Sequence, residues 1–151
     1  MALKEIFTKE SILLDVKSTA RDELFTEMVR ALCSLYPELD VSRAICALNE
    51  REEKMSTGIM HSVGIPHAVV PSISKTIGCI AVSKKGIDYD SLDKAPVHLA
   101  FMLLTGEGRE EEHVKILREL ALVLTKNDFV NKALECKTSS EIYDLIVQYS
   151  K

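Results

Sequence analysis

Two nearly continuous apolar segments, IGCIAV at 77–82 and VHLAFMLL at 97–104, constrain the fold of this chain more than any other feature. A strand with one face in water alternates apolar and polar residues, but these two segments show little alternation. Both are far shorter than the roughly 18 apolar residues of a membrane-spanning helix. They therefore predict buried strands of a sheet that is covered on both faces, and their close spacing allows them to pair as antiparallel neighbours.

Helices predicted on the N-terminal side of these strands can supply part of that cover. Thr19 can cap a first helix whose exit is marked by Pro37. Asp40 can cap a second helix that runs toward Arg51. Apolar residues recur at helical spacing in both segments, as Leu24, Phe25, Met28, Leu32 and Leu35 in the first and Val41, Ala44, Ile45 and Leu48 in the second.

Helices predicted after the second apolar segment can cover the other face of the sheet. The EEE run at 110–112 places negative charge in the first turn of a helix, where the helix dipole favours it. Asn127 or Asp128 can cap a short helix, and Thr138 with Glu141 resembles the capping box of a last helix. The expected apolar stripes are Val114, Leu117, Leu120, Ala121 and Leu124 in the first of these helices and Ile142, Leu145, Ile146 and Tyr149 in the last.

This alternation of helices and apolar strands defines an α/β fold class. We expect a mixed central sheet of about five strands, flanked by helices on both faces. Residues 12–16 are a further strand candidate, and residues 86–92 can add an edge strand or a hairpin arm. No internal repeat, low-complexity tract or linker interrupts the sequence, so residues 1–151 are expected to form a single domain.

Composition excludes several classes of protein. The net charge is −4, from 19 basic and 23 acidic residues, so the chain lacks the basic surplus of proteins that bind nucleic acids. Glu5 and Glu10 interrupt the N-terminal segment, which argues against a signal peptide, and no direct membrane insertion is expected. The four cysteines form no C-x-x-C pair, so we expect thiols in a reducing cytoplasm rather than a zinc ribbon.

The turn-rich segment at 56–71 holds the first candidate for chemistry, His67. Pro66 precedes it, and the fixed φ of proline presents the next residue stiffly. Imidazole is a competent nucleophile near neutral pH, because its ordinary pKa of about 6.5 leaves a free lone pair. The alternative is a loop histidine without a chemical role.

Arg51 and His113 are the second and third candidates. Arg51 is expected at a helix end, and its planar guanidinium suits a phosphate or a carboxylate. His113 is expected in the first turn of its helix, where free N–H groups would welcome a phosphate. The alternatives are a solvated arginine at a helix terminus and a structural histidine bonded to a carbonyl group.

The remaining histidines and the known nucleotide motifs suggest no further site. His61 lies six residues before His67, so a site shared by the two is possible but not required. His98 begins an apolar strand and is expected to be structural. No helical H-x-x-x-H or Cys/His cluster is present, which argues against a zinc site. Neither G-x-x-x-x-G-K-[ST] nor G-x-G-x-x-G occurs, so a nucleotide-binding fold of either of these kinds is not indicated.

The candidate residues lie within motifs that resemble a known family. These motifs are RE at 51–52, STGI at 56–59, IPHA at 65–68, PVHL at 96–99 and EH at 112–113. In this order and spacing they resemble the enzyme IIA component of the bacterial phosphoenolpyruvate-dependent sugar phosphotransferase system, in its fructose/mannitol class. That class includes the nitrogen-regulatory IIA proteins, and the resemblance covers essentially the whole chain.

The resemblance implies that His67 accepts a phosphoryl group from the phosphocarrier protein HPr. His67 would then pass the group to a IIB component in sugar uptake, or hold it as a signal to regulatory target proteins. Arg51 and His113 match the family's active-site arginine and second histidine. No metal or cofactor is implied, because the phosphoryl donor is itself a phosphohistidine.

The resemblance also leaves two points open. Family members usually carry glycine where Met60 and Ser62 stand here, so the conformation of the loop before His67 is expected to differ. A ligand-binding α/β domain that has lost transfer activity is a third possible function. The presence of Arg51, His67 and His113 together argues against that possibility.

Overall fold

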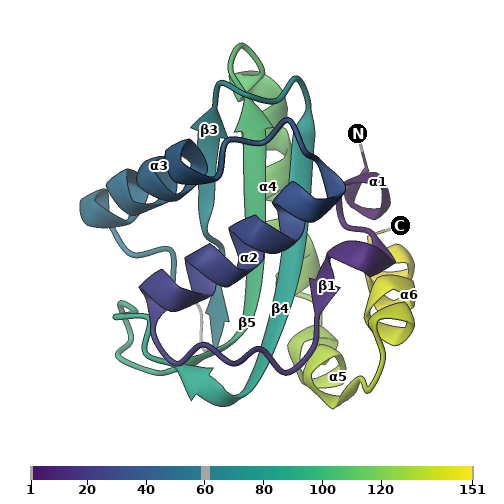
Figure 1. The fold of residues 1–151 in the computed structure, drawn as a ribbon. Coiled ribbons are helices and arrows are strands. Elements are labelled where there is room, and N and C mark those ends of the chain that lie inside the picture. Colours follow the sequence, from purple (N-terminus) through teal and green to yellow (C-terminus); the bar gives the residue numbers. More distant parts are fainter. Residues whose placement is uncertain (1, 59–61, 151) are drawn as a thin grey trace.

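The computed structural model describes residues 2–58 and 62–150 and has helices on both faces of a central sheet (Figure 1). Within these residues the sheet contains five strands, namely β1 (Ile12–Leu13), β2 (Val63–Gly64), β3 (His67–Val70), β4 (Thr76–Ile87) and β5 (Val97–Gly106). Parallel and antiparallel pairs both occur in it. The predicted α/β fold with a mixed sheet is confirmed.

The two apolar segments form the centre of the sheet. β4 and β5 pair antiparallel, from Thr76 opposite Thr105 to Val82 opposite Leu99. β1 pairs in parallel with β4, while β2 and β3 both pair in parallel with β5, so each long strand has neighbours on both sides. The prediction of adjacent, buried strands at 77–82 and 97–104 is confirmed, and it holds because helices cover both faces of these strands.

The short strands β2 and β3 form the edge of the sheet that carries His67. Val63 lies opposite Leu99 and His67 lies opposite Leu103, so both short strands run beside β5. Pro66 separates them; it has no N–H to donate, and its carbonyl oxygen accepts from Leu103 N at 3.0 Å. The prediction of an irregular segment at 56–71 is therefore wrong for His67, which is the first residue of a strand.

One face of the sheet is covered by α2 (Arg21–Leu35) and α3 (Val41–Lys54), which lie in front of it in Figure 1. The carboxylate of Asp40 accepts from Arg43 N at 3.1 Å, which confirms the predicted cap of α3. The cap of α2 differs from the prediction, because Thr19 lies one residue too early. The core on this face contains Leu24, Phe25, Met28, Val29 and Leu32 of α2, Ala44 and Leu48 of α3, and Ala100, Met102 and Leu104 of β5.

The other face is covered by α4 (Glu110–Leu124), α5 (Phe129–Glu135) and α6 (Ser139–Tyr149), together with α1 (Leu3–Ile6) and the short 3₁₀ helix η1 (Lys9–Ser11). The predicted cap of α6 is confirmed, since Thr138 Oγ1 accepts from Glu141 N at 3.1 Å. The sequence did not indicate α1 and η1, which are too short to show a periodic pattern. The core on this face contains Leu3, Ile6 and Phe7, Ile80 and Val82 of β4, Leu99, Phe101 and Leu103 of β5, and Ile116, Leu120, Phe129, Ile142 and Ile146 of the helices.

Two expectations about local structure are corrected. Residues 86–92 do not form a separate strand, because β4 continues to Ile87 beyond an irregularity that follows Val82. The stripe predicted for α4 is right for Leu120 and Leu124, which are buried, but wrong for Val114, which is 52% exposed. Apolar residues occupy much of the circumference of α4, so its sequence is compatible with two different buried stripes. In the structure, α4 packs on the sheet with the stripe that includes His113. The buried residues of α4 are His113, Ile116, Leu120, Val123 and Leu124.

The length and apolar character of the described helices show whether any of them could cross a membrane. Across residues 2–58 and 62–150, none of them combines the length and the apolar character that crossing a bilayer requires.

Candidate active site

His67, Arg51 and His113 meet at the edge of the sheet, although they come from three different elements. Side chains alternate along β3; Ala68 and Val70 belong to the core under α2 and α3, so His67 points to the opposite face, where α4 begins. The ring centroids of His67 and His113 are 5.3 Å apart, with the rings tilted by 48°. Arg51, in the last turn of α3, reaches His67 because β3 lies at the edge of the sheet.

Two hydrogen bonds fix the tautomer of the His67 ring. Nδ1 lies 2.7 Å from the carbonyl oxygen of Ile65, so Nδ1 must carry the proton that this acceptor receives. Arg51 Nε–H donates to Nε2 at 3.3 Å, so Nε2 carries a lone pair. Burial lowers the pKa of His67, and the charge of Arg51 lowers it further, against an upward effect of the Ile65 bond and of Glu52. The ring is therefore neutral near pH 7, with its nucleophilic nitrogen toward Arg51.

Arg51 is held by the end of its own helix as well as by His67. Its Nη1 donates to the carbonyl oxygen of Met55 at 2.8 Å, immediately beyond the end of α3. This bond satisfies a free carbonyl of the helix terminus and restricts the guanidinium to the region beside His67. A permanent cation is thus placed within reach of any group that becomes attached to Nε2.

His113 is buried and bonded to the sheet. Its Nδ1 lies 2.7 Å from Thr105 Oγ1, and that hydroxyl lies 3.1 Å from Thr76 Oγ1 on β4. Burial, followed by the proximity of His67, lowers the pKa of His113 to about 4, against a smaller upward effect of Glu110. His113 is therefore neutral near pH 7, and its Nε2 is left for another partner.

A shallow pocket of about 240 Å³ opens above these side chains. It is lined by Ala47, Glu50, Arg51, Lys54, His67, Ala68, Val69 and His113. The space suits a small charged group presented by another molecule better than an enclosed small-molecule ligand, because the known cavities for such ligands are about 300–1,000 Å³. The structure thus brings Arg51, His67 and His113 together at one open pocket.

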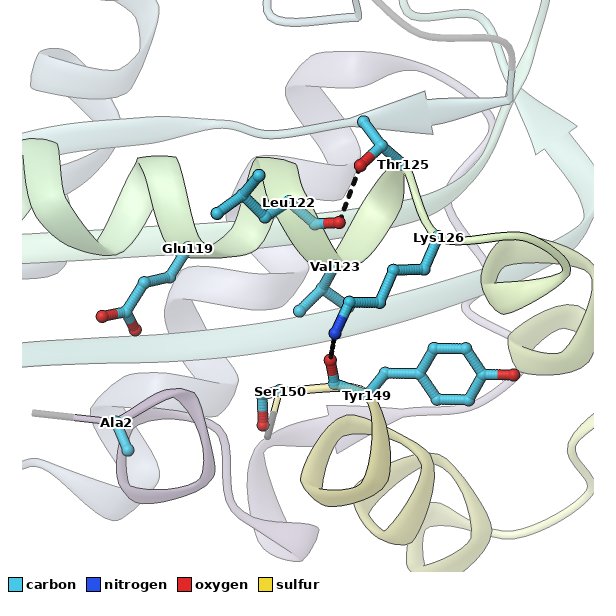
Figure 2. Close-up of a pocket in the computed structure, with 8 residues that line it drawn as sticks. All are labelled: Ala2, Glu119, Leu122, Val123, Thr125, Lys126, Tyr149 and Ser150. Carbon is cyan, nitrogen blue, oxygen red and sulfur yellow. Dashed lines mark hydrogen bonds between the residues drawn. The ribbon is translucent and has the colours of Figure 1, made fainter.

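A larger pocket, of about 590 Å³, lies elsewhere, between α1, α4 and α6 (Figure 2). Its described lining residues include neither histidine nor cysteine. The ammonium group of Lys126 donates to the carbonyl oxygen of Tyr149 across this pocket, so its cation is already engaged with the end of α6. Size therefore does not identify the reactive site in this fold, whereas the chemistry of the lining residues does.

The other candidates from the sequence do not join the site. His98 Nδ1 lies 2.9 Å from the carbonyl oxygen of Ser83, in a bond between β5 and β4. His61 and Met60 lie outside the described residues. Ser62 has a φ of +67°, a left-handed backbone that glycine adopts with least strain. Within the described part of the chain, no group of three or more His, Cys, Asp or Glu residues could hold a metal ion.

Glu52 and Thr105 support the two histidines, and neither was among the site residues predicted from the sequence. Glu52 is 5% exposed and binds Thr57 and Tyr89 beside the site. Its burial could have been inferred, because it follows Ala44 and Leu48 at spacings of four residues and so continues the buried stripe of α3. Thr105 could not have been inferred, since its bond to His113 depends on tertiary structure.

Lowering the pH should destabilise the fold through His113. Its pKa is about 4 in the folded protein against about 6.5 when unfolded, so the unfolded chain binds the proton more tightly. Its contribution is complete above pH 6.5 and is lost as the pH falls toward 4. We expect the free energy of unfolding to fall by roughly 1–2 kcal/mol over this pH range. One pKa unit corresponds to about 1.4 kcal/mol, and solvent in the adjoining pocket screens part of the effect.

The measurement compares urea unfolding of the wild-type protein and of His113→Gln at several pH values between 4 and 7. The variant should show the shallower dependence of the free energy of unfolding on pH. Parallel curves for the two proteins would exclude a depressed pKa at His113.

Comparison with known proteins places this geometry in a family. A family model described as "Phosphoenolpyruvate-dependent sugar phosphotransferase system, EIIA 2" matches residues 5–149. The "PTS system fructose-specific EIIABC component" of Bacillus subtilis is 33% identical over 151 residues. These residues are 100% of this chain but 24% of that relative, so the chain spans about a quarter of its length.

Solved structures agree with this match. The nitrogen regulatory protein IIA-Ntr of Neisseria meningitidis has a TM-score of 0.88 and 25% identity, over 95% of this chain and 98% of that one. The mannitol IIA enzyme of Escherichia coli, solved in complex with phosphorylated IIB, shares the fold at 16% identity, with a TM-score of 0.79 over 94% of this chain and 99% of that one. This chain belongs to the EIIA type 2 family of the phosphoenolpyruvate-dependent sugar phosphotransferase system, a family of histidine phosphoryl-transfer proteins.

Proposed function

We propose that this chain accepts a phosphoryl group from an HPr-type phosphocarrier protein on His67 and passes it to a IIB component in sugar uptake. The observation that carries the proposal is the tautomer of His67. Its Nδ1–H is bonded to Ile65 while Nε2 keeps a lone pair beside Arg51 at the mouth of an open pocket. A neutral imidazole with one nitrogen held and the other free is the state that a phosphoryl acceptor needs.

The transfer exchanges one nitrogen–phosphorus bond for another. The Nε2 lone pair of His67 attacks phosphorus in line as the bond to the donor histidine breaks, and the donor nitrogen takes back its electron pair. No proton has to leave His67 during attack, because Nδ1 keeps its proton. The hydrogen bond from Nδ1–H to the carbonyl oxygen of Ile65 disperses the positive charge of the phosphorylated ring. Donor and acceptor are chemically alike, so the reverse step and onward transfer use the same path.

Arg51 and His113 would stabilise the transferred group. The Nε–H of Arg51 would turn from Nε2 to a phosphoryl oxygen, where a positioned cation offsets developing charge. His113 would donate from Nε2 when the Thr105 hydroxyl donates to its Nδ1. The proposal requires neither a metal nor a cofactor, because positioning and charge stabilisation account for most of the catalysis of phosphoryl transfer.

A regulatory role is the second candidate, and the relatives favour it as much as uptake. The nitrogen regulatory proteins of Pseudomonas aeruginosa and Neisseria meningitidis resemble this chain over nearly its whole length. In that role His67 would be phosphorylated by the same donor, and the phosphorylation state would control regulatory target proteins. Either role treats residues 1–151 as one IIA domain in the cytoplasm, which the four free cysteines support.

The two roles differ in the fate of the phosphoryl group once it is on His67. The protein would first be phosphorylated with phosphoenolpyruvate, enzyme I and HPr, and then freed from those components. A purified IIB domain of the fructose class would be added, and loss of phosphate from this chain would be measured over time. Transfer of the phosphate to the IIB domain within seconds to minutes supports uptake. Phosphate that stays on this chain supports regulation, provided that the same IIB domain accepts phosphate from another IIA protein in a control. Failure of the first step would contradict both roles.

A further inference from the structure

Glu52 is a buried carboxylate that neither accepts nor donates phosphate in the function proposed above. Its side chain is 1% exposed, and its charged neighbour is Arg21, whose Nη1 lies 3.8 Å from Oε2. A carboxylate removed from water is costly unless hydrogen bonds satisfy its oxygens. The structure satisfies them with Thr57, in the segment that leads to His67, and with Tyr89, so the identity of these donors indicates what the carboxylate does.

Three donors converge on Glu52, and two belong to Thr57. Thr57 N donates to Oε2 at 3.0 Å, and Thr57 Oγ1 donates to Oε1. The hydroxyl of Tyr89 donates to Oε1 at 3.2 Å and also lies 2.6 Å from Thr57 Oγ1. An ionised carboxylate only accepts hydrogen bonds, so it matches this set of donors, whereas a carboxamide would direct its own N–H groups at some of them.

A continuous series of hydrogen bonds links Glu52 to the His67 ring. Thr57, which Glu52 holds, offers its carbonyl oxygen to Ile65 N at 3.1 Å. Ile65 in turn offers its carbonyl oxygen to His67 Nδ1 at 2.7 Å. Each bond places the backbone group that makes the next one, so the acceptor that fixes the His67 tautomer is positioned from α3.

Tyr89 packs against the same segment and keeps it in place. A Cβ atom on Gly58 would lie 2.9 Å from Tyr89 Cδ1, and one on Gly64 would lie 3.1 Å from Tyr89 Cζ. The aromatic ring thus contacts the backbone on both sides of the loop before His67. Burial, with the charge of Glu52, holds the pKa of Tyr89 well above its usual range, so its hydroxyl remains a donor.

We propose that Glu52 is a positioning residue for phosphoryl transfer: through Thr57 and Ile65 it holds His67 in the Nδ1–H tautomer with Nε2 as the nucleophile. This inference rests on the proposed function of His67. It explains why a carboxylate, rather than an apolar residue, continues the buried stripe of α3 next to Arg51.

The test uses Glu52→Gln, which preserves size but supplies donors where the site needs acceptors. The exposed neighbour Glu53→Gln is the matched control, because it makes the same change on the same helix. Long-range ¹H–¹⁵N NMR spectra of the unphosphorylated proteins report which ring nitrogen of His67 is protonated. We expect a single Nδ1–H form in wild type and Glu53→Gln, and a mixture of tautomers in Glu52→Gln.

Kinetics supply the second readout. Phosphorylation by HPr at saturation should slow roughly 10- to 100-fold in Glu52→Gln, the range seen when the outer partners that orient metal-binding histidines are removed. The KM for HPr should stay within about twofold, because Glu52 is buried and cannot touch a partner protein. Thr57→Val should shift the tautomer in the same direction, and Thr57→Ser should restore the wild-type spectrum.

The outcomes separate this inference from the function on which it rests. An unchanged His67 tautomer and rate in Glu52→Gln would overturn the positioning role while leaving His67 as the phosphoryl acceptor. Absence of phosphorylation in the wild-type protein would overturn the function, yet the spectra would still decide what Glu52 does to the ring. If Glu52→Gln fails to fold, the Thr57→Val and Thr57→Ser pair decides, and identical spectra for both would contradict the proposal.

Discussion

Replacing His67 by alanine is expected to abolish phosphorylation of this protein by phosphoenolpyruvate, enzyme I and HPr. Nε2 of His67 is the nitrogen with an available lone pair beside the Arg51 cation, and alanine offers no substitute nucleophile. His113 should not take over, because it is only 8% exposed and the Arg51 cation is bonded to His67, so a donor protein reaches the His113 ring less readily. The labelled phosphate should fall to background, by more than about 10³-fold in initial rate.

The matched control for this prediction is His98→Asn. His98 is bonded to a carbonyl of β4 within the sheet, so its replacement should leave the labelling rate unchanged. The free energy of unfolding of His67→Ala should change by less than about 1 kcal/mol, because the ring is only half-buried at an edge strand. Labelling of His67→Ala at the wild-type rate would exclude His67 as the acceptor.

Removing Arg51 should give the second largest loss. Its Nε–H lies 3.3 Å from the nucleophile, where it can bind a phosphoryl oxygen during transfer. Loss of one preorganised donor to developing charge costs about 2.7–4 kcal/mol, so Arg51→Ala should slow phosphorylation roughly 10²- to 10³-fold. Arg51→Lys should recover only part of the rate, because an ammonium cannot bond to Met55 and the phosphoryl group in the same forked geometry.

Arg43→Ala tests whether this loss is specific to the position of Arg51. Arg43 is an exposed arginine on the same helix, two turns earlier, so its removal changes net charge equally without touching the site. Its rate should match wild type within about twofold, since exposed charges contribute little. Equal losses in Arg43→Ala and Arg51→Ala would mean that the net charge of α3, rather than a contact at His67, controls the reaction.

The parts of the fold that sequence predicts well are those with strong local patterns. The apolar segments at 77–82 and 97–104 show little alternation, and only a sheet covered on both faces can bury them. Asp40 and Thr138 identify helix starts because their side chains bond to the backbone three residues ahead. The stripe of α4 is predicted only in part: Leu120 and Leu124 are buried, but Val114 is exposed, because the apolar residues of α4 lie around much of its circumference and only tertiary packing selects the side with His113.

In the candidate site, too, some residues could be predicted from local sequence and others could not. Arg51, His67 and His113 are residue types with evident chemistry, and the family resemblance groups them from the sequence motifs alone. The support of the site is different, since Glu52 meets Tyr89 and Thr105 meets His113 through contacts between separate elements. Such contacts leave no spacing in the sequence, so the tautomer of His67 could be inferred only from the folded arrangement.

The central claim is that phosphate becomes attached to Nε2 of His67 while Nδ1 keeps its proton. It is tested most directly by ³¹P and long-range ¹H–¹⁵N NMR of the ¹⁵N-labelled protein during phosphorylation by enzyme I and HPr. We predict one phosphohistidine, with phosphorus coupled to Nε2 of His67 and a protonated Nδ1 still bonded to Ile65. Phosphate coupled to Nδ1 of His67, or found on any other residue, would contradict the account.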